Sequence, residues 1–288
     1  MKYAIITNPV SGRLSADQKR SALAEAAEIL GAEIHGLDTV TADDLGQCAR
    51  EIVNRCDVLV VAGGDGTLSD IINSIDAAET PIAFLPLGTG NAIRHALRYK
   101  GSLADIATRI RDGKIHEYDL IACSQNKRAF TGSIGFEGTT IRLRQRYLAQ
   151  GAGGLRAYLP AIFHAYFREY KRVVAKITVD GATFEVNNLL SLMIVKQPYY
   201  GYGLKVVPRA QFNDGRLHMV CVNSGLFICA VGAISAFTFG SRIGQYRTGQ
   251  QVTVKLQQPL LLQLDGNIAW EADRFAFTVL PNALKIKC

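Results

Sequence analysis

The sequence predicts an α/β protein with two domains, a doubly wound α/β domain followed by a β-sandwich-like domain. At 288 residues the chain is long for one hydrophobic core, since a domain averages roughly 150 residues. Its first part alternates apolar runs with helix-like segments, which is typical of a parallel sheet. From about residue 115 onward, β-branched runs dominate instead. We therefore expect domains over 1–118 and 119–288, with a last strand that could return to the first domain.

In the first domain, the residues 58–62 read Val-Leu-Val-Val-Ala, a continuous apolar run that suits a parallel strand buried on both faces. Residues 16–30 are rich in Ala, Glu and Leu and favour a helix. The same reasoning gives strands at 3–7, 34–37, 58–62 and 81–85, and helices at 16–30, 43–55, 68–75 and 92–97. This order is that of a doubly wound fold.

In the second domain, short strand-like runs are separated by turns. Asp180-Gly181 and Asn213-Asp214-Gly215 are the clearest turn signals between such runs. The expected strands are 129–134, 173–179, 189–195, 217–222, 252–256, 260–264 and 275–279. A sandwich of two sheets accommodates this pattern.

Two segments interrupt the strands of the second domain. Residues 147–170 form a helix-like stretch of aromatic and basic residues, which suits either anionic lipid headgroups or a solvated helical face with a buried aromatic stripe. Residues 225–240 are almost wholly apolar but shorter than the ~20 residues that span a bilayer. A buried helix, or one lying on a membrane, fits this second segment.

The net charge of +7 favours an anionic partner, which could be a nucleotide, nucleic acid or an acidic membrane surface. We expect no nucleic acid partner, because no nucleic-acid motif accompanies the charge. The six cysteines lack the spacing of a zinc site, and the apolar N-terminal run is too short for a signal peptide. These features favour reduced thiols and a cytoplasmic protein, with peripheral membrane contact and a homodimer left open.

The strand at 58–62 leads into Gly63-Gly64-Asp65-Gly66-Thr67, and a helix follows. Glycines let backbone N–H groups approach phosphate oxygens, and a helix N-terminus adds unpaired donors. The alternative is a tight strand-to-helix connection in which Asp65 or Thr67 caps the helix. An aspartate beside phosphates must hold Mg²⁺, accept a proton or serve as a cap.

Two further turns strengthen the phosphate-binding interpretation. Pro86-Leu87-Gly88-Thr89-Gly90-Asn91 follows one strand, and Asn8-Pro9-Val10-Ser11-Gly12-Arg13 follows another. In an open α/β sheet, ligands bind outside the carboxyl ends of the strands. None of the three turns is a Walker A motif.

These motifs, in this order, resemble those of the bacterial diacylglycerol and lipid kinases, which are related to sphingosine kinases and more distantly to NAD kinases. In the second half, residues 133–136, 208–215 and 264–266 also match that family. The resemblance covers nearly the whole chain. It implies a two-domain kinase that uses ATP and Mg²⁺ to phosphorylate the hydroxyl of a lipid.

The resemblance also implies roles for individual residues. Asp214, with the backbone of Gln211 and Arg216, corresponds to the family's metal site, although a plain β-turn is an equal alternative. The residues expected to contact the nucleotide are Asn8, Arg13, Thr39, Gly63, Gly64, Asp65, Gly66, Thr67, Thr89, Gly90 and Asn91.

The proton acceptor is less clear. Asp65 and Asp265 are the two acidic candidates, but the family's Asp-Gly-Glu motif reads Asp265-Gly266-Asn267 here. An amide at Asn267 accepts a hydrogen bond but does not titrate. Either Asp265 acts as the base or catalysis is impaired. A lipid kinase, a kinase of another hydroxyl substrate such as NAD, and a non-catalytic nucleotide- or lipid-binding protein therefore remain in competition.

Overall fold

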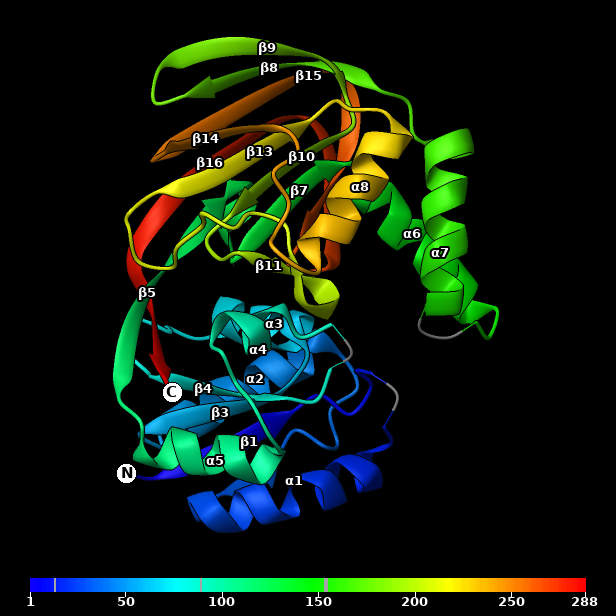
Figure 1. Ribbon diagram of the computed structural model, residues 1–288. Coiled ribbons are helices and arrows are strands. Elements are labelled where there is room, and N and C mark those ends of the chain that lie inside the picture. The colour runs from blue at the N-terminus through cyan, green and yellow to red at the C-terminus, as the bar shows by residue number, and fades with distance from the viewer. Residues whose placement is uncertain (13, 89, 153–154) are drawn as a thin grey trace. The chain divides into compact units, whose positions relative to one another are not determined.

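The computed structural model describes residues 1–12, 14–88, 90–152 and 155–288 (Figure 1). The chain forms two compact units. The first contains residues 1–120, 199–203 and 281–288, and the second contains residues 121–198 and 204–280. Two short segments from the later part of the sequence thus belong to the first unit.

The first unit is built on a parallel sheet in the order β4-β3-β1-β2. Its strands are β1 (Tyr3–Thr7), β2 (Glu33–His35), β3 (Val58–Gly63) and β4 (Ile82–Pro86). Every residue of β1, β3 and β4 is buried, as expected for apolar strands covered on both faces. The end of the last strand, β16 (Asn267–Lys287), pairs with β4 through Ile286 and Ile82.

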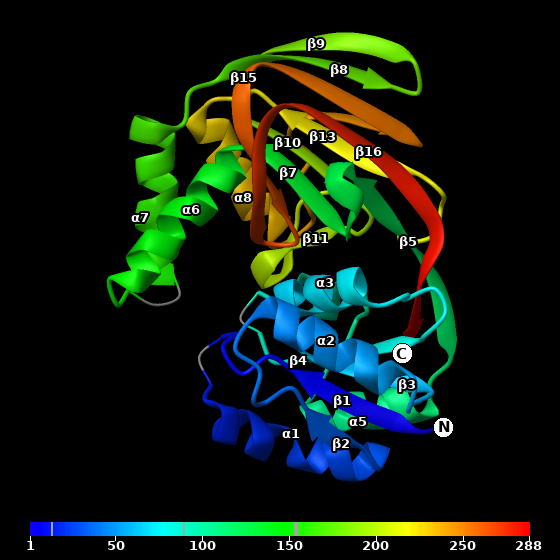
Figure 2. The same cartoon turned by 180° about the vertical axis from the view of Figure 1, so that it is seen from behind.

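Helices cover both faces of this sheet. They are α1 (Ala16–Leu30), α2 (Ala42–Val53), α3 (Asp65–Ser74), α4 (Ala92–Ala96) and α5 (Leu103–Asp112). Helix α1 packs against α5 and α2 packs against α3, and the two pairs lie on opposite faces (Figures 1 and 2). The doubly wound α/β prediction is confirmed.

Capping boxes fix the starts of three of these helices. Ser15, Thr41 and Ser102 each accept a hydrogen bond from the backbone N–H three residues on, and the side chain at that later position accepts one from the backbone N–H of the cap residue. Helix α1 matches the expected bounds, and α2 begins one residue earlier than expected. Helix α5 was not expected from the sequence.

The second unit is an antiparallel sheet whose strands run in the order β14-β13-β10-β7-β15-β16. Strands β8 and β9 pair with each other, and β8 also pairs with β15. The bounds are β7 (Thr131–Gly135), β8 (Val173–Val179), β9 (Ala182–Leu189), β10 (Ser191–Val195), β13 (Leu217–Val222), β14 (Gln245–Gly249) and β15 (Gln251–Leu264). This confirms a β-sandwich-like second part.

Several strands differ from their expected bounds. The runs 252–256 and 260–264 form the single strand β15, which changes register between Lys255 and Leu260. Its first part pairs with β8 and its last residues pair with β7, so one strand serves both layers. Strand β9 was not expected, although Asp180-Gly181 does form the hairpin turn before it.

Short elements complete the chain. The expected strand 129–134 is divided at Phe130 between β6 and β7. The short elements are β5 (Ile115–Cys123), η1 (Ser124–Asn126), β6 (Lys127–Ala129), β11 (Tyr199–Tyr200), η3 (Gly201–Gly203) and β12 (Leu204–Lys205). Strand β5 pairs with β6 and β16.

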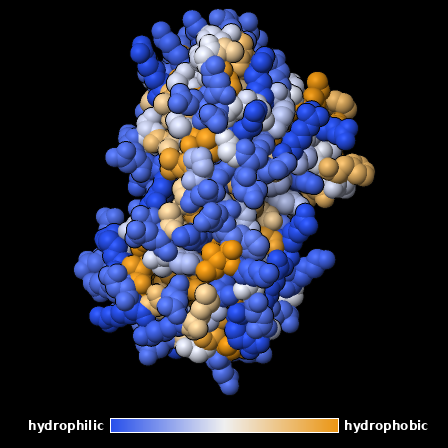
Figure 3. All heavy atoms as spheres, turned by 90° about the vertical axis from the view of Figure 1, so that its left-hand side faces the viewer, coloured by the Kyte–Doolittle hydropathy of each residue, from blue (hydrophilic) through white to orange (hydrophobic). Residues whose placement is uncertain are grey.

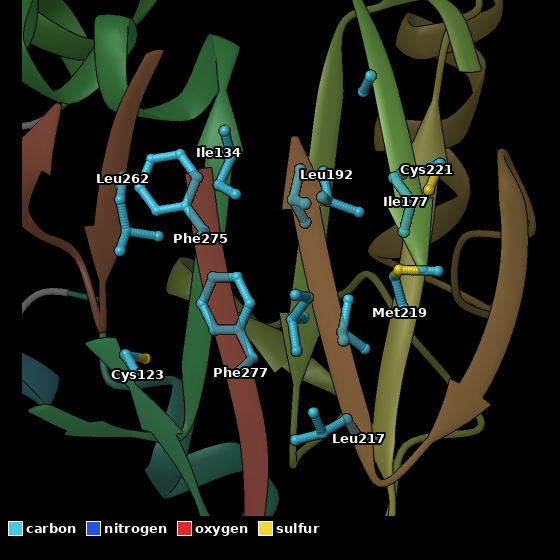
Figure 4. Close-up of a cluster of buried hydrophobic side chains, with 14 of the residues drawn as sticks. Cys123, Ile134, Ile177, Leu192, Leu217, Met219, Cys221, Leu262, Phe275 and Phe277 are labelled. Atoms are coloured by element: carbon cyan, nitrogen blue, oxygen red, sulfur yellow. The ribbon is translucent and has the colours of Figure 1, made fainter. Parts of the chain in front are cut away.

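The core of the second unit lies between its strands (Figure 4). Phe275 and Phe277 of β16 lie beside Ile134 of β7 and Leu262 of β15, and all four side chains are buried. Alternate residues of the strands supply this apolar interior, as the period of a half-buried strand requires. The core therefore fixes the register of β7 against β15.

The helices of the second unit differ most from expectation. Instead of one helix over 147–170, the chain forms α6 (Phe136–Ala149), α7 (Leu155–His164) and a π-helical turn, η2 (Ala165–Glu169). Helix α8 (Leu226–Ala236) accounts for the apolar segment. Only Gly232 and Ala236 of α8 are buried, so its large apolar side chains point to solvent.

No helix in the described part of the chain is long and apolar enough to cross a membrane. The face drawn in Figure 3 is mostly hydrophilic, with apolar residues in small separate patches.

Candidate functional site

Three turns leave the same edge of the sheet in the first unit. Thr7 pairs with Ala62, and Gly63 pairs with Pro86, so the carboxyl ends of β1, β3 and β4 lie level. The turns that follow them begin beside one another. The predicted residues Asn8, Gly63, Gly64, Asp65, Gly66, Thr67, Gly90 and Asn91 are thus brought to one edge. Arg13 and Thr89 lie outside the described residues.

Two of these turns approach so closely that only glycine fits. A Cβ on Gly88 would lie 2.5 Å from the Cα of Gly64, and one on Gly63 would lie 2.7 Å from the side chain of Thr67. The backbone N–H groups of Leu87 and Gly88 donate to the carbonyl of Gly63, at 2.8 and 3.1 Å. The glycines therefore allow the two loops to touch through their backbones.

Asp65 joins the same two turns. Its Oδ2 accepts a hydrogen bond from the backbone N–H of Ala92 at 2.8 Å, and its Oδ1 accepts one from Ile93 at 3.1 Å. Asp65 therefore caps α4, 27 residues away, and not its own helix. Burial raises the pKa of Asp65, while these backbone N–H groups act in the opposite direction. The geometry favours a positioning role for Asp65 over proton transfer.

Helix α3 begins without a side-chain cap, because its N-cap residue is Gly64. The first N–H groups of a helix have no partner within the helix, so those of the first turn of α3 can bind an anion. Asn91, just before α4, contributes a buried side-chain acceptor. Its Nδ2 donates to Gly88 at 2.5 Å, but its buried Oδ1 has no partner among the described residues.

The turn after β1 is held by a lysine that the sequence analysis did not identify. The buried Lys19 ammonium donates to the carbonyls of Asn8, Pro9 and Ser11, the last two at 2.8 and 2.6 Å. Burial lowers the pKa of Lys19. Lys19 lies on the same helical stripe as the buried residues Leu23, Ala26 and Leu30. A lysine on the otherwise apolar stripe of a predicted helix was a sequence signal that could have identified Lys19.

Thr39 lies in the loop after β2. Its hydroxyl donates to the carbonyl of Gly36 at 2.8 Å. A Cβ on Gly36, which has a φ of 82°, would lie 2.7 Å from the carbonyl oxygen of Thr7. The loop that carries Thr39 therefore meets the end of β1, and its hydroxyl is engaged within that loop.

A segment from the later part of the sequence packs on the glycine turn. The backbone N–H of Tyr202 donates to Gly90 at 2.9 Å, and the ring of Tyr199 lies 5.7 Å from that of His95. His95 also lowers the pKa of Asp65, although less than burial raises it. The sequence analysis missed both features, although the tyrosine- and glycine-rich run at 199–203 was a visible signal.

Asp265 and Asn267 lie in the second unit, where β15 turns into β16. The Asp265 carboxylate accepts hydrogen bonds from the backbone N–H groups of Thr131 and Phe130, at 2.9 and 3.1 Å, and is nearly buried. Asn267, two residues later, is exposed. The two candidates therefore differ in environment: Asp265 is fixed in orientation and Asn267 faces solvent.

Asp214, Gln211 and Arg216 form a third group, also in the second unit. Oδ1 of Asp214 accepts from Nζ of Lys196 at 2.8 Å, and Oδ2 lies 2.9 Å from Nε2 of His218. The carbonyl of Arg216 also accepts from Lys196, at 2.6 Å, and the backbone N–H of Gln211 points to His218 at 3.2 Å. A lysine already binds two of the three expected ligands, Asp214 and Arg216, so these residues do not fit a divalent ion.

Comparisons with known proteins were consistent with this fold. Residues 2–123 match the family model of the diacylglycerol kinase catalytic domain, and residues 149–288 match the YegS C-terminal NAD kinase beta sandwich-like domain. A diacylglycerol kinase of Staphylococcus saprophyticus is 28% identical over 276 residues, which are 91% of this chain and 87% of that protein. One from Staphylococcus aureus strain MRSA252 is 28% identical, over 76% of this chain and 69% of that protein.

Solved structures show the same fold. A diacylglycerol kinase from Bacillus anthracis strain Sterne superposes with a TM-score of 0.73 at 17% identity, over 99% of this chain and 96% of that one. An NAD kinase from Archaeoglobus fulgidus, solved in complex with ATP, superposes with a TM-score of 0.53 at 13% identity, over 100% and 94%.

The Asp65→Asn variant should lower both stability and nucleotide affinity. An amide has one acceptor oxygen, so its NH₂ group must face one of the two N–H donors of α4, at a cost of about 1–3 kcal/mol. Thermal unfolding and ATP calorimetry measure the two effects. Asp43→Asn, an exposed aspartate in the first turn of α2, is the matched control. An Asp65→Asn protein that matches this control in both measurements would contradict the capping role.

The Lys19→Met variant should loosen the turn at Asn8. It removes three donors from a buried place but keeps most of the apolar stem, and a hydrogen bond from a charged donor contributes about 1.5–3 kcal/mol. We expect a lower Tm and at least about 10-fold weaker ATP binding. Arg20→Met, an exposed neighbour on α1, should change neither. An unchanged ATP affinity in Lys19→Met would show that Lys19 does not contribute to nucleotide binding.

Proposed function

The chain carries the diacylglycerol kinase catalytic domain and the YegS C-terminal domain by their family models. On that premise, we propose that it transfers the γ-phosphate of ATP to the hydroxyl of a diacylglycerol-like lipid. The observation that carries this proposal is the edge of the sheet where three turns meet. There, the Asp65 carboxylate accepts two hydrogen bonds from the start of α4, and the glycine turns approach each other through their backbones. Such an edge can bind phosphates through backbone N–H groups.

We propose that the nucleotide phosphates bind at this edge of the first unit. The uncapped start of α3 supplies N–H donors and the partial positive charge of a helix N-terminus. Asn91 Oδ1 is an acceptor that a hydroxyl or amino group of the nucleotide could use. Residues 8–12, held by Lys19, form the third side of this edge.

Magnesium, when bound, would neutralise charge on the transferring phosphoryl group. Within the described residues, no cluster of three or more His, Cys, Asp or Glu side chains is placed to hold a metal ion. We therefore propose that the ion reaches the site on the nucleotide phosphates. The chain's own contribution is to orient those phosphates.

For the acceptor hydroxyl, we propose Asp265 as the orienting group. Backbone N–H bonds from Phe130 and Thr131 fix its carboxylate, and a fixed carboxylate can accept a hydrogen bond from an alcohol. Asn267 is the observation that favours a second candidate, a nucleotide- and lipid-binding protein without turnover. Its exposed amide cannot accept the proton that an alcohol must lose.

A substrate panel tests the reaction. With γ-labelled ATP and Mg²⁺, we expect label in diacylglycerol presented in mixed micelles, and none in NAD. Sphingosine and phosphatidylglycerol complete the panel. ATP binding in calorimetry without label in any acceptor would support the non-catalytic alternative, and label in NAD alone would overturn the lipid proposal.

The Asn267→Glu variant tests the role of the missing acid. If proton transfer limits the rate, a carboxylate at this exposed position should raise kcat at least about 10-fold, because general base catalysis contributes about 10²–10⁴-fold. Asn187→Glu, at another exposed asparagine in a strand, is the control and should leave kcat unchanged. An unchanged kcat in Asn267→Glu would show that the amide does not limit turnover.

We propose further that α8 brings the enzyme to its lipid. Phe227, Ile234 and Phe237 are 81%, 70% and 64% exposed, and α8 carries no charged residue. The helix is too short to span a bilayer, but its apolar side chains can enter the headgroup boundary. An exposed apolar surface of this kind marks an interaction site.

The charge around α8 indicates an anionic bilayer as the partner. Residues 216–264 contain no Asp or Glu. Arg172 donates to the carbonyls of Asn223 and Ser224, at 2.7 and 2.6 Å, and so lies at the start of the helix. Basic residues beside an apolar face favour acidic headgroups, each adding about 1 kcal/mol near the surface.

Vesicle flotation measures this contact. Wild-type protein should float with vesicles that contain phosphatidylglycerol, and less with neutral phosphatidylcholine vesicles. Ile234→Ser should weaken binding about 5- to 10-fold through lost apolar burial. Val40→Ser is the matched control, because Val40 is 72% exposed in the first unit and Ile234 is 70% exposed. Equal binding by both variants, or self-association through α8 in place of flotation, would contradict the membrane proposal.

A further inference from the structure

A buried lysine occupies the place where the resemblance implies a metal ion. The Lys196 side chain is wholly buried just beyond the end of β10. Its Nζ donates to Oδ1 of Asp214 at 2.8 Å and to the backbone carbonyl of Arg216 at 2.6 Å. These oxygens are two of the three ligands that the metal assignment requires, and the third is the backbone of Gln211. An ammonium group therefore binds both oxygens from within the chain.

The loop between these ligands is shaped for a cation. Gly215 lies between them with a φ of 66°, and the backbone N–H of Arg216 donates to Oδ1 of Asp214 at 3.2 Å. This turn directs the carboxylate and the Arg216 carbonyl to the same point. Oxygen atoms alone make up this pair of ligands, as a hard cation prefers.

The other oxygen of Asp214 is also engaged. It lies 2.9 Å from Nε2 of His218, whose Nδ1 lies 2.8 Å from the hydroxyl of Tyr246. The backbone N–H of Gln211 also reaches Nε2, at 3.2 Å, so the His218 ring lies between Asp214 and the first residue of the loop. Burial lowers the pKa of His218 more than Asp214 raises it.

The electrostatic balance of Asp214 agrees with this pairing. Burial by itself raises the pKa of Asp214, but the hydrogen bond from Lys196 and the nearby His218 outweigh it, so the pKa lies below its ordinary value. A divalent ion would need to lie about 2.0–2.6 Å from the same oxygens. It would then overlap the Lys196 ammonium and repel it.

We infer that Lys196 supplies the cation of the loop 211–216, and that this loop binds no divalent ion. The positive charge that a bound metal ion would supply comes from the Lys196 side chain. The second unit should therefore keep its stability when metal ions are removed. This inference is independent of the kinase proposal, because it concerns a nucleotide-free loop and predicts no catalytic step.

Thermal unfolding without nucleotide tests the inference. Wild-type Tm should be the same in EDTA and in millimolar Mg²⁺ or Mn²⁺. Lys196→Ala should lower Tm by about 10 °C, because it removes two hydrogen bonds from a buried charged donor and leaves the half-buried Asp214 without its main partner. In that variant, Mn²⁺ should recover part of the loss. Lys196→Ala/Asp214→Asn should show no recovery, and Lys176→Ala, an exposed lysine of β8, should behave as wild type.

The inference would be overturned if EDTA lowered the wild-type Tm and Asp214→Asn removed that effect. It would also be overturned if Lys196→Ala folded but gained nothing from any divalent ion. If Lys196→Ala does not fold, Mn²⁺ titration of the wild-type protein by electron paramagnetic resonance still decides. We expect the wild-type protein to show no bound Mn²⁺ signal that is lost in Asp214→Asn. A bound Mn²⁺ of that kind would contradict the inference.

Discussion

Two hydrogen bonds to the Asp65 carboxylate organise the nucleotide half of the site. The donors are the backbone N–H groups of Ala92 and Ile93, at the start of a five-residue helix that has no other side-chain cap. Hydrogen bonds to a charged acceptor contribute about 1.5–3 kcal/mol, which helps to offset the cost of burying the carboxylate. These hydrogen bonds hold the start of α4 in place. Gly88 contacts Gly64 there, so the edge of the sheet where the turns meet is lined by glycine backbone.

The sequence was enough to predict the sheet and the edge, because those depend on local signals. The apolar runs of β1, β3 and β4 and the capping box at Ser15 are each readable within a few residues. Helix α5 was missed although its signals are also local, since Ile106, Ala107 and Ile110 recur at helical spacing after the capping box at Ser102. The sequence analysis predicted two strands where the structure has the single strand β15. The change of register between Lys255 and Leu260 depends on pairing with β8 and β7, which local patterns do not contain.

The contacts that define the site are mostly non-local, and sequence patterns do not contain them. Asp65 caps a helix 27 residues away, and Tyr202 binds a turn that lies more than a hundred residues earlier. Lys19 differs, since its place on an apolar stripe could have revealed it. Lys196 gave no such signal, because its partner Asp214 follows only after an intervening segment that belongs partly to the first unit. The resemblance singled out Asp214, Gln211 and Arg216, but it gave no sign of the lysine that binds two of them.

The central claim is that nucleotide phosphates bind where β1, β3 and β4 end. A crystal structure with a non-hydrolysable ATP analogue and Mg²⁺ tests it most directly. The account predicts phosphate oxygens within hydrogen-bond distance of backbone N–H groups in the first turn of α3 and in the turn that begins at Gly88, with Asp65 still bound to α4. Phosphates bound elsewhere, or an Asp65 that leaves α4 to coordinate the metal ion, would contradict it.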